Sequence, residues 1–240
     1  MRRTTILILI IFLGGCSAVG SPLSSGDETS VLIVGNSHTF YNNMPEMVER
    51  IADQNGIDLE VDMAAQPGFY LDQHANSPET LDAINNGEYD VVVFQEQSVA
   101  PAVPQLYSQR TAPALTQLSN TARATGSQIV LYQTWARRDG LPEAGFGDYS
   151  TMQAAIIDGY NRLAASNGAT VAPVGQAWQQ AHSLGQSGFL YDPDGNHASA
   201  EGSYLAAIVI GETVTGTRFT EGPSLGDVDE NEVTQLLSYN

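Results

Sequence analysis

The sequence predicts an α/β fold in which a parallel sheet lies between layers of helices. Short, β-branched apolar runs alternate along the chain with longer segments whose apolar residues recur at helical spacing. The first run, residues 31–34 (VLIV), is apolar throughout, as is typical of a parallel strand buried on both faces. A chain of 240 residues is also long enough to bury a full core in one sizeable domain.

Five strands are expected. Residues 91–94 (VVVF) form a continuous apolar run like the first, whereas residues 57–64 alternate between apolar and polar side chains. Pro173 lies in the last run and favours an edge position, because proline has no N–H to donate to a neighbouring strand. The expected strands are residues 31–34, 57–64, 91–94, 129–132 and 171–174.

The segments between these runs predict helices. Met47, Val48 and Ile51 recur on one side of the first helix, and Pro78 suits the first position of the second. The expected helices are residues 45–54, a short one from residue 78, one from residue 113 to Gly126, residues 151–166 and residues 199–214. Five strands with intervening helices predict a flavodoxin-like three-layer α/β/α sandwich with a five-stranded parallel sheet.

The charge of the chain is strongly one-sided. There are 27 acidic residues against 9 basic ones, all of them arginine, and the formal net charge is -18. Such a surface repels the phosphate backbone, so no nucleic-acid partner is expected. An acidic surface without lysine is typical of proteins from salt-loving organisms.

The N-terminal residues predict export. Arg2 and Arg3 precede an apolar run, residues 6–13, which is too short to span a bilayer. The following Gly14-Gly15-Cys16 resembles a lipoprotein signal, in which the cysteine is lipidated and anchors the protein at the cell surface or membrane. The alternative is an ordinary export signal with an incidental cysteine. The expected organisation is a signal peptide (1–15), a flexible tether (16–30), a folded domain (31–216) and an acidic C-terminal extension (217–240).

Candidate catalytic residues follow the predicted strands, where ligands bind in open parallel sheets. Ser37 lies on a tight turn after the first strand, and a serine needs a base to become a nucleophile. His197 is the candidate base, and Asp194, three residues earlier, could orient its ring. An oxyanion would require fixed donors, for which the Ser37 amide, the Gly68 amide and a side-chain amide after the third strand are candidates.

These segments resemble the four blocks of the SGNH hydrolase superfamily, the GDSL-like esterases and lipases. Gly35-Asn36-Ser37 resembles the GDS of the first block, with Asn36 in place of Asp, and Asp194 to His197 matches DxxH. The resemblance implies a Ser37–His197–Asp194 triad and an oxyanion hole formed by Ser37, Gly68 and a glutamine. The third block reads QEQS and resembles a Gln-containing version found in carbohydrate acetylesterases; Gln95 is the first choice, and Gln97, on the same strand face, is the alternative.

The expected function is therefore that of a surface-anchored serine esterase acting on carboxylic esters, with acetyl esters on carbohydrates as the expected substrates. A single cysteine and the lack of HExxH or paired-histidine spacing predict no metal and no cofactor. Two alternatives remain: a non-catalytic glycan-binding surface lipoprotein and an acyltransferase on the same fold. His38 could line the pocket or cap the following helix, and His74 and His182, among polar residues, are expected to be exposed.

Overall fold

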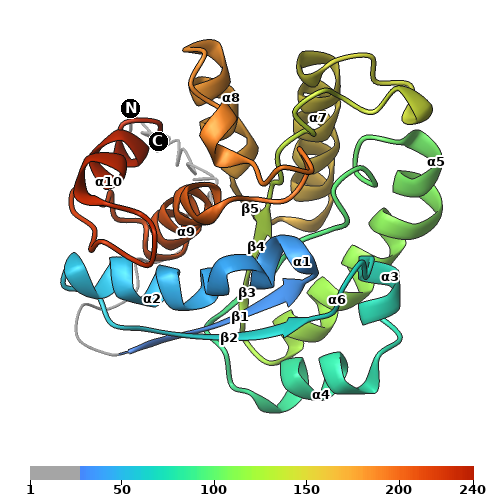
Figure 1. The fold of residues 1–240 in the computed structure, drawn as a ribbon. Coiled ribbons are helices and arrows are strands. Elements are labelled where there is room, and N and C mark those ends of the chain that lie inside the picture. Colours follow the sequence, from blue (N-terminus) through green and yellow to red (C-terminus); the bar gives the residue numbers. More distant parts are fainter. Residues whose placement is uncertain (1–27) are drawn as a thin grey trace, which may run out of the picture.

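The structure is a computed structural model that describes residues 28–240 (Figure 1). The predicted signal peptide, the lipidation site Cys16 and most of the predicted tether lie outside this part of the chain. The last two tether residues, Thr29 and Ser30, instead begin the first strand, where they pair with Leu59 and Glu60. The folded domain therefore starts two residues earlier than expected.

The described strands form one parallel sheet in the order β2-β1-β3-β4-β5. Their bounds are β1 Thr29–Gly35, β2 Leu59–Ala65, β3 Val91–Phe94, β4 Gln128–Tyr132 and β5 Thr170–Ala172. β5 is at an edge, as Pro173 predicts. The predicted three-layer α/β/α fold with a five-stranded parallel sheet is confirmed.

Helices cover both faces of the sheet (Figure 1). Val31 and Ile33 of β1 face the core shared with α2 (Met44–Gln54), α8 (Val174–Ser183), α9 (Ala200–Thr215) and α10 (Glu230–Leu237). Leu32 and Val34 face the other core, shared with α3 (Leu71–His74), α4 (Pro78–Asn86), α6 (Ala112–Ala124) and α7 (Tyr149–Asn167). The strict alternation explains why the central strands are apolar throughout. No helix within residues 28–240 is both long and apolar enough to cross a bilayer.

α8 is a helix that the sequence patterns do not predict. The expected last strand ran to Val174, but β5 ends at Ala172 and Val174 is the first residue of α8. Pro173 separates the two elements, and α8 then buries Ala177, Trp178 and Ala181 at helical spacing. The remaining short helical segments are α1 (Ser37–Phe40), η1 (Tyr41–Asn43), α5 (Pro104–Leu106), η2 (Tyr107–Thr111), η3 (Pro142–Ala144) and η4 (Gly188–Leu190).

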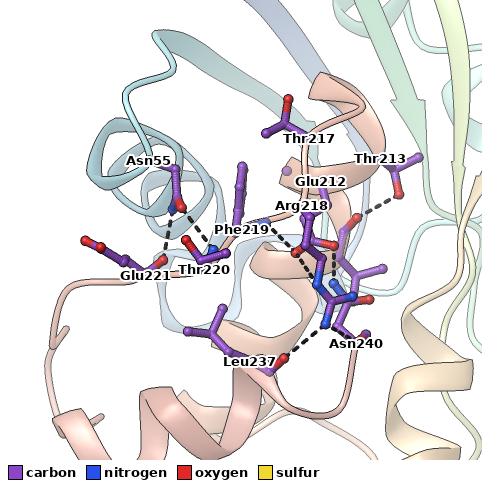
Figure 2. A network of polar contacts seen from close by, with 12 residues as sticks. Asn55, Glu212, Thr213, Thr217, Arg218, Phe219, Thr220, Glu221, Leu237 and Asn240 are labelled. Carbon is purple, nitrogen blue, oxygen red and sulfur yellow. Dashed lines mark hydrogen bonds and ion pairs between the residues drawn. The ribbon is translucent and has the colours of Figure 1, made fainter.

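The C-terminal segment, residues 217–240, is part of the same domain rather than a separate extension. Phe219, Val233 and Leu236 are buried in the same core as the apolar residues of α2 and α9. Figure 2 shows the polar contacts that hold this segment: Glu212 of α9 accepts a hydrogen bond from the Phe219 amide (2.7 Å) and pairs with Arg218 (3.6 Å). Arg218 also donates to the carbonyl of Leu237 (3.3 Å). The boundary expected at residue 216 marks the end of α9, not the end of the domain.

Candidate active site

Ser37 lies on a tight turn at the carboxyl end of β1. β1 ends at Gly35, Asn36 caps the short helix α1, and Ser37 is the first residue of that helix. A Cβ at position 35 would lie 2.4 Å from Thr39 Oγ1 and 2.5 Å from Gln95 Oε1, so only glycine fits there. The turn therefore projects Ser37 beyond the sheet edge, where parallel sheets bind ligands.

Ser37, His197 and Asp194 form a continuous series of hydrogen bonds. The Ser37 hydroxyl lies 3.0 Å from His197 Nε2, and His197 Nδ1 lies 2.6 Å from Asp194 Oδ2. A carboxylate can only accept, so Nδ1 carries the proton and Nε2 is left to accept the serine proton. The three residues that the sequence predicts as a triad therefore lie together in an arrangement that suits general-base chemistry.

Two titratable groups of the site have shifted pKa values. Desolvation acts to raise the pKa of Asp194, but hydrogen bonds from the His197 ring and from the amides of Asn196 and His197 outweigh it and lower the pKa to about 2. Burial, followed by the charge of His197, lowers the pKa of His38 to about 3. Asp194 is therefore ionised and His38 neutral throughout the neutral range.

The loop that carries Asp194 and His197 is braced by residues that the sequence analysis missed. Asp194 Oδ1 accepts hydrogen bonds from the amides of Asn196 and His197, both at 2.9 Å. Trp135 donates through its indole N–H to the carbonyl of Asn196 (2.9 Å), and its ring stacks on Trp178 of α8 at 4.1 Å. Trp135 follows β4 by three positions, so inspection of the end of the fourth strand would have found it.

Gly68 lines the same cleft as Ser37 and lies on the turn that follows β2. Gln66-Pro67-Gly68-Phe69 forms a turn closed by a hydrogen bond from the Phe69 amide to the Gln66 carbonyl (3.2 Å), with Gly68 at φ +70°. Proline and then glycine at the central positions are typical of a type II turn. In the described part of the chain, neither the Ser37 amide nor the Gly68 amide donates a backbone hydrogen bond. Both are free to bind an anionic oxygen at the cleft.

The structure places the two candidate glutamines differently. Gln95 is 1% exposed; its Oε1 accepts from the Asn36 amide (2.8 Å) and the Thr39 hydroxyl (3.1 Å), and its Nε2 donates to the Glu96 carbonyl. Gln97 lines the cleft, and its Oε1 accepts from the Val99 amide (3.0 Å). The Gln97 NH₂ has no partner among residues 28–240. The first choice, Gln95, is thus buried against the turn that carries Ser37, and the alternative, Gln97, lies at the cleft.

The cleft has a volume of about 550 Å³ and lies between the segments that follow β1, β2 and β3 and the Asp194–His197 loop. Besides the residues named above, it is lined by His38, Phe40, Tyr41, Pro67 and Ser98. Of the two roles considered for His38, its side chain takes the cleft wall, while the cap of α1 is Asn36. Among residues 28–240, no three His, Cys, Asp or Glu side chains are grouped so as to hold a metal ion.

His74 is buried, and the expectation that it is exposed is wrong. The residue is 1% exposed, and both ring nitrogens have partners: Nε2 lies 2.8 Å from the carbonyl of Gly35, and Nδ1 lies 2.9 Å from the Thr80 hydroxyl. His74 therefore contacts the last residue of β1, two positions before Ser37. The exposed position expected for His182 is confirmed.

Comparisons with known proteins show the family and the fold of this chain. No family model and no curated protein matches the sequence. Among solved structures, one from Slackia heliotrinireducens, described as an SGNH hydrolase, is 34% identical over 78% of this chain and 100% of its own, with a TM-score of 0.66. Two more distant structures are similar in fold. A DUF4886 family protein from Bacteroides uniformis is 20% identical over 89% of this chain and 93% of its own, with a TM-score of 0.76. A carbohydrate esterase family 3 protein from Talaromyces cellulolyticus is 14% identical over 78% of this chain and 97% of its own, with a TM-score of 0.58. The chain belongs to the SGNH hydrolases.

Proposed function

We propose that this SGNH hydrolase is a serine esterase that cleaves carboxylic esters with Ser37, His197 and Asp194. The observation that carries the proposal is the continuous series of contacts from Ser37 Oγ to His197 Nε2 (3.0 Å) and from His197 Nδ1 to Asp194 (2.6 Å). An isolated surface serine needs no such series, whereas a nucleophilic serine requires a base that is itself oriented.

In the first half of the reaction, Ser37 Oγ attacks the ester carbonyl while His197 Nε2 takes its proton. The resulting imidazolium then gives that proton to the leaving alcohol as the C–O bond breaks, which leaves an acyl group on Ser37. In the second half, His197 takes a proton from water, the hydroxide attacks the acyl carbonyl, and Ser37 leaves with the proton. Asp194, ionised because its pKa is lowered to about 2, stabilises the imidazolium in both halves.

Three donors are proposed for the oxyanion that forms at each attack. They are the Ser37 amide, the Gly68 amide and the NH₂ of Gln97, which takes the place first expected for Gln95. Gln97 is favoured because the Val99 amide must bond to the oxygen of its side chain, which leaves its NH₂ for the cleft. The NH₂ of Gln95 is bound to the Glu96 carbonyl and is buried.

Acetyl esters on carbohydrates are the proposed substrates. Phe40 lines the cleft beside polar groups of Asn36 and Asn196, a combination suited to the apolar faces and hydroxyl edges of sugar rings. The likeness of the fold to a carbohydrate esterase supports the same substrate class.

We further propose that Cys16 is lipidated and anchors the protein at the cell surface. The first described residues lead into β1, and the cleft lies beyond the other end of that strand, about 20 Å away at 3.3 Å per residue. The expected flexible tether between Cys16 and the domain would give the cleft reach to substrates outside the membrane.

The test is release of p-nitrophenol from p-nitrophenyl acetate by the purified protein, in low and in multimolar salt. We expect Ser37→Ala and His197→Ala each to lower turnover by roughly 10³-fold or more. Ser98→Ala removes a serine hydroxyl from the same cleft that has no histidine partner in the described chain, and it should retain most of the turnover. Absence of turnover in a folded protein would contradict the proposal and favour a glycan-binding lipoprotein.

The substrate class needs its own measurement. Acetate release from acetylated oligosaccharides is compared with hydrolysis of p-nitrophenyl esters of increasing acyl length. Higher kcat/KM for acetyl than for butyryl and octanoyl esters, together with acetate release from the oligosaccharide, supports the proposed class. Transfer of the acetyl group to an added alcohol in preference to water would identify an acyltransferase.

A further inference from the structure

The ring of Tyr41 lies flat against the ring of His197. The two ring centroids are 4.3 Å apart and the planes differ by 10°. Tyr41 is half-buried and lines the cleft, and it comes from the segment that directly follows the short helix carrying Ser37. One face of the proposed catalytic base is therefore covered by a side chain that belongs to the nucleophile's own segment.

The next residue, Asn42, clamps this segment to the histidine loop. Its side-chain NH₂ lies 3.1 Å from the carbonyl of Ala198, 2.9 Å from that of Ser199 and 2.9 Å from the hydroxyl of Ser203. Asn42 has φ 53°, in the left-handed region that asparagine tolerates better than most residues. The bridge joins positions about 160 residues apart in the chain: Asn42 comes five residues after Ser37, and Ala198 comes directly after His197.

We infer that Tyr41 and Asn42 are positioning residues for His197, an inference that rests on the proposed esterase function. Asn42 holds the backbone on both sides of the contact, and Tyr41 holds the imidazole in the plane that points Nε2 at Ser37. When His197 takes the serine proton it becomes a cation, and a cation against an aromatic face is attracted by the ring quadrupole. The stack thus favours the protonated ring that forms when His197 removes the serine proton.

The test compares Tyr41→Phe, which keeps the aromatic face, with Tyr41→Leu, which removes it. We expect Tyr41→Phe to keep kcat on p-nitrophenyl acetate within about twofold and Tyr41→Leu to lower it about three- to thirtyfold, with KM little changed. Tyr107→Leu is the matched control, because Tyr107 is also half-buried and stacks on Arg162, outside the cleft. A loss confined to KM, or an equal loss in Tyr41→Phe, would overturn the inference and make Tyr41 a substrate contact.

Asn42→Gly tests the clamp separately. Glycine adopts the left-handed backbone conformation without strain, so this variant removes the amide contacts while keeping the turn. We expect it to lower kcat severalfold, while the midpoint of thermal unfolding stays close to that of the native protein. An unchanged kcat would contradict the role of Asn42.

A spectroscopic measurement keeps the inference testable even without turnover. Ring-current shifts of the His197 ring protons are read by NMR, with the signal assigned among the four histidines by its loss in His197→Ala. We expect an upfield shift in the native protein and in Tyr41→Phe that disappears in Tyr41→Leu. A shift that survives Tyr41→Leu refutes the stack, whereas a stack seen by NMR in a protein without esterase activity counts against the proposed function alone.

Discussion

The side-chain NH₂ of Asn36 donates a hydrogen bond of 2.9 Å to the carbonyl oxygen of Phe69. The oxygen of the same side chain accepts from the His38 amide (3.2 Å), so Asn36 joins the turn that carries Ser37 to the turn that carries Gly68. This side-chain amide, together with the Gln66 amide that donates to the Gly35 carbonyl (3.1 Å), holds the two proposed backbone donors of the oxyanion hole relative to each other. An ionised aspartate, usual at this position of the GDS motif, could cap the helix but could not donate to Phe69.

Asn36→Asp should therefore weaken the site. The new carboxylate faces a carbonyl oxygen without a proton between them, and we expect kcat/KM to fall about tenfold or more and the free energy of unfolding to fall by about 1–2 kcal/mol. Asn76→Asp is the control, because Asn76 is exposed and also donates to a backbone carbonyl, that of Asp72. Steady-state kinetics and denaturant unfolding measure both effects. Unchanged kinetics in Asn36→Asp would show that the link does not set the oxyanion geometry.

Gln97 and Gln95 should respond in opposite ways to substitution. Gln97→Glu keeps the acceptor for the Val99 amide and replaces the NH₂ by an oxygen, so we expect kcat to fall about 10²- to 10³-fold with little loss of stability. Gln95→Ala leaves the Asn36 amide and the Thr39 hydroxyl without their partner, and should lower the free energy of unfolding by about 2–3 kcal/mol. A Gln95 variant that folds normally but loses kcat, beside an active Gln97→Glu, would restore Gln95 as the oxyanion donor.

Glu96 should make stability fall as pH rises. The side chain is 1% exposed, and burial raises its pKa above the ordinary value of 4.5 despite hydrogen bonds from the Gln97 and Leu71 amides. Because the folded state holds this proton more tightly than the unfolded state, its contribution to stability is present below pH 4.5 and is lost as pH rises through the folded pKa.

Glu96→Gln keeps an oxygen for both amides and cannot ionise. At pH 8 we expect its free energy of unfolding to exceed that of the native protein by about 1–3 kcal/mol, with kcat retained. Denaturant unfolding between pH 4 and pH 8 measures the difference, and the exposed Glu143→Gln controls for the change in net charge. A native protein at least as stable as Glu96→Gln at pH 8 would refute the assignment.

Glu212 should hold the C-terminal segment. Its side chain is 13% exposed, and its carboxylate is shared by the Phe219 amide, Arg218 and the side chain of Asn240 (Figure 2). Glu212→Ala should lower the free energy of unfolding by about 2–3 kcal/mol and expose residues 217–240 to proteolysis, with kcat unchanged. Glu221→Ala is the control, since Glu221 accepts from Asn55 through its backbone carbonyl (2.9 Å) and its exposed side chain accepts only a long hydrogen bond from Gln54 (3.4 Å). Equal effects of both variants would show that Glu212 is not the anchor of this segment.

The parts of this protein that depend on local pattern could be predicted from the sequence. The central strands are apolar runs because both faces are buried. The edge position of the last strand was predicted from Pro173, which the structure places directly after β5. The turn at Gly68 follows from proline and glycine at its centre. α8 was missed because Val174, apolar and next to a strand, fits either element until the buried Trp178 shows the helical spacing.

The choice between Gln95 and Gln97 could not be made from local sequence pattern. Both follow β3, and alternation places them on the same face, yet one is turned under the Ser37 turn and the other toward the cleft. His74 could not be predicted as buried either, because its neighbours in sequence are polar and its partner, the carbonyl of Gly35, is distant in sequence. Which side chain meets which partner depends on segments that are distant in sequence.

The sequence by itself determined the sheet and the positions of Ser37 and Gly68 after its strands, which follow from short-range periodicity, turn chemistry and the rule that parallel strands end at one edge. Asp194 and His197 were expected beside Ser37 from the resemblance of their segment to the DxxH block. Only the tertiary structure decided that Tyr41 stacks on His197 and that Trp135 holds the carbonyl of Asn196. Such contacts are set by the packing of whole elements, which no local pattern encodes.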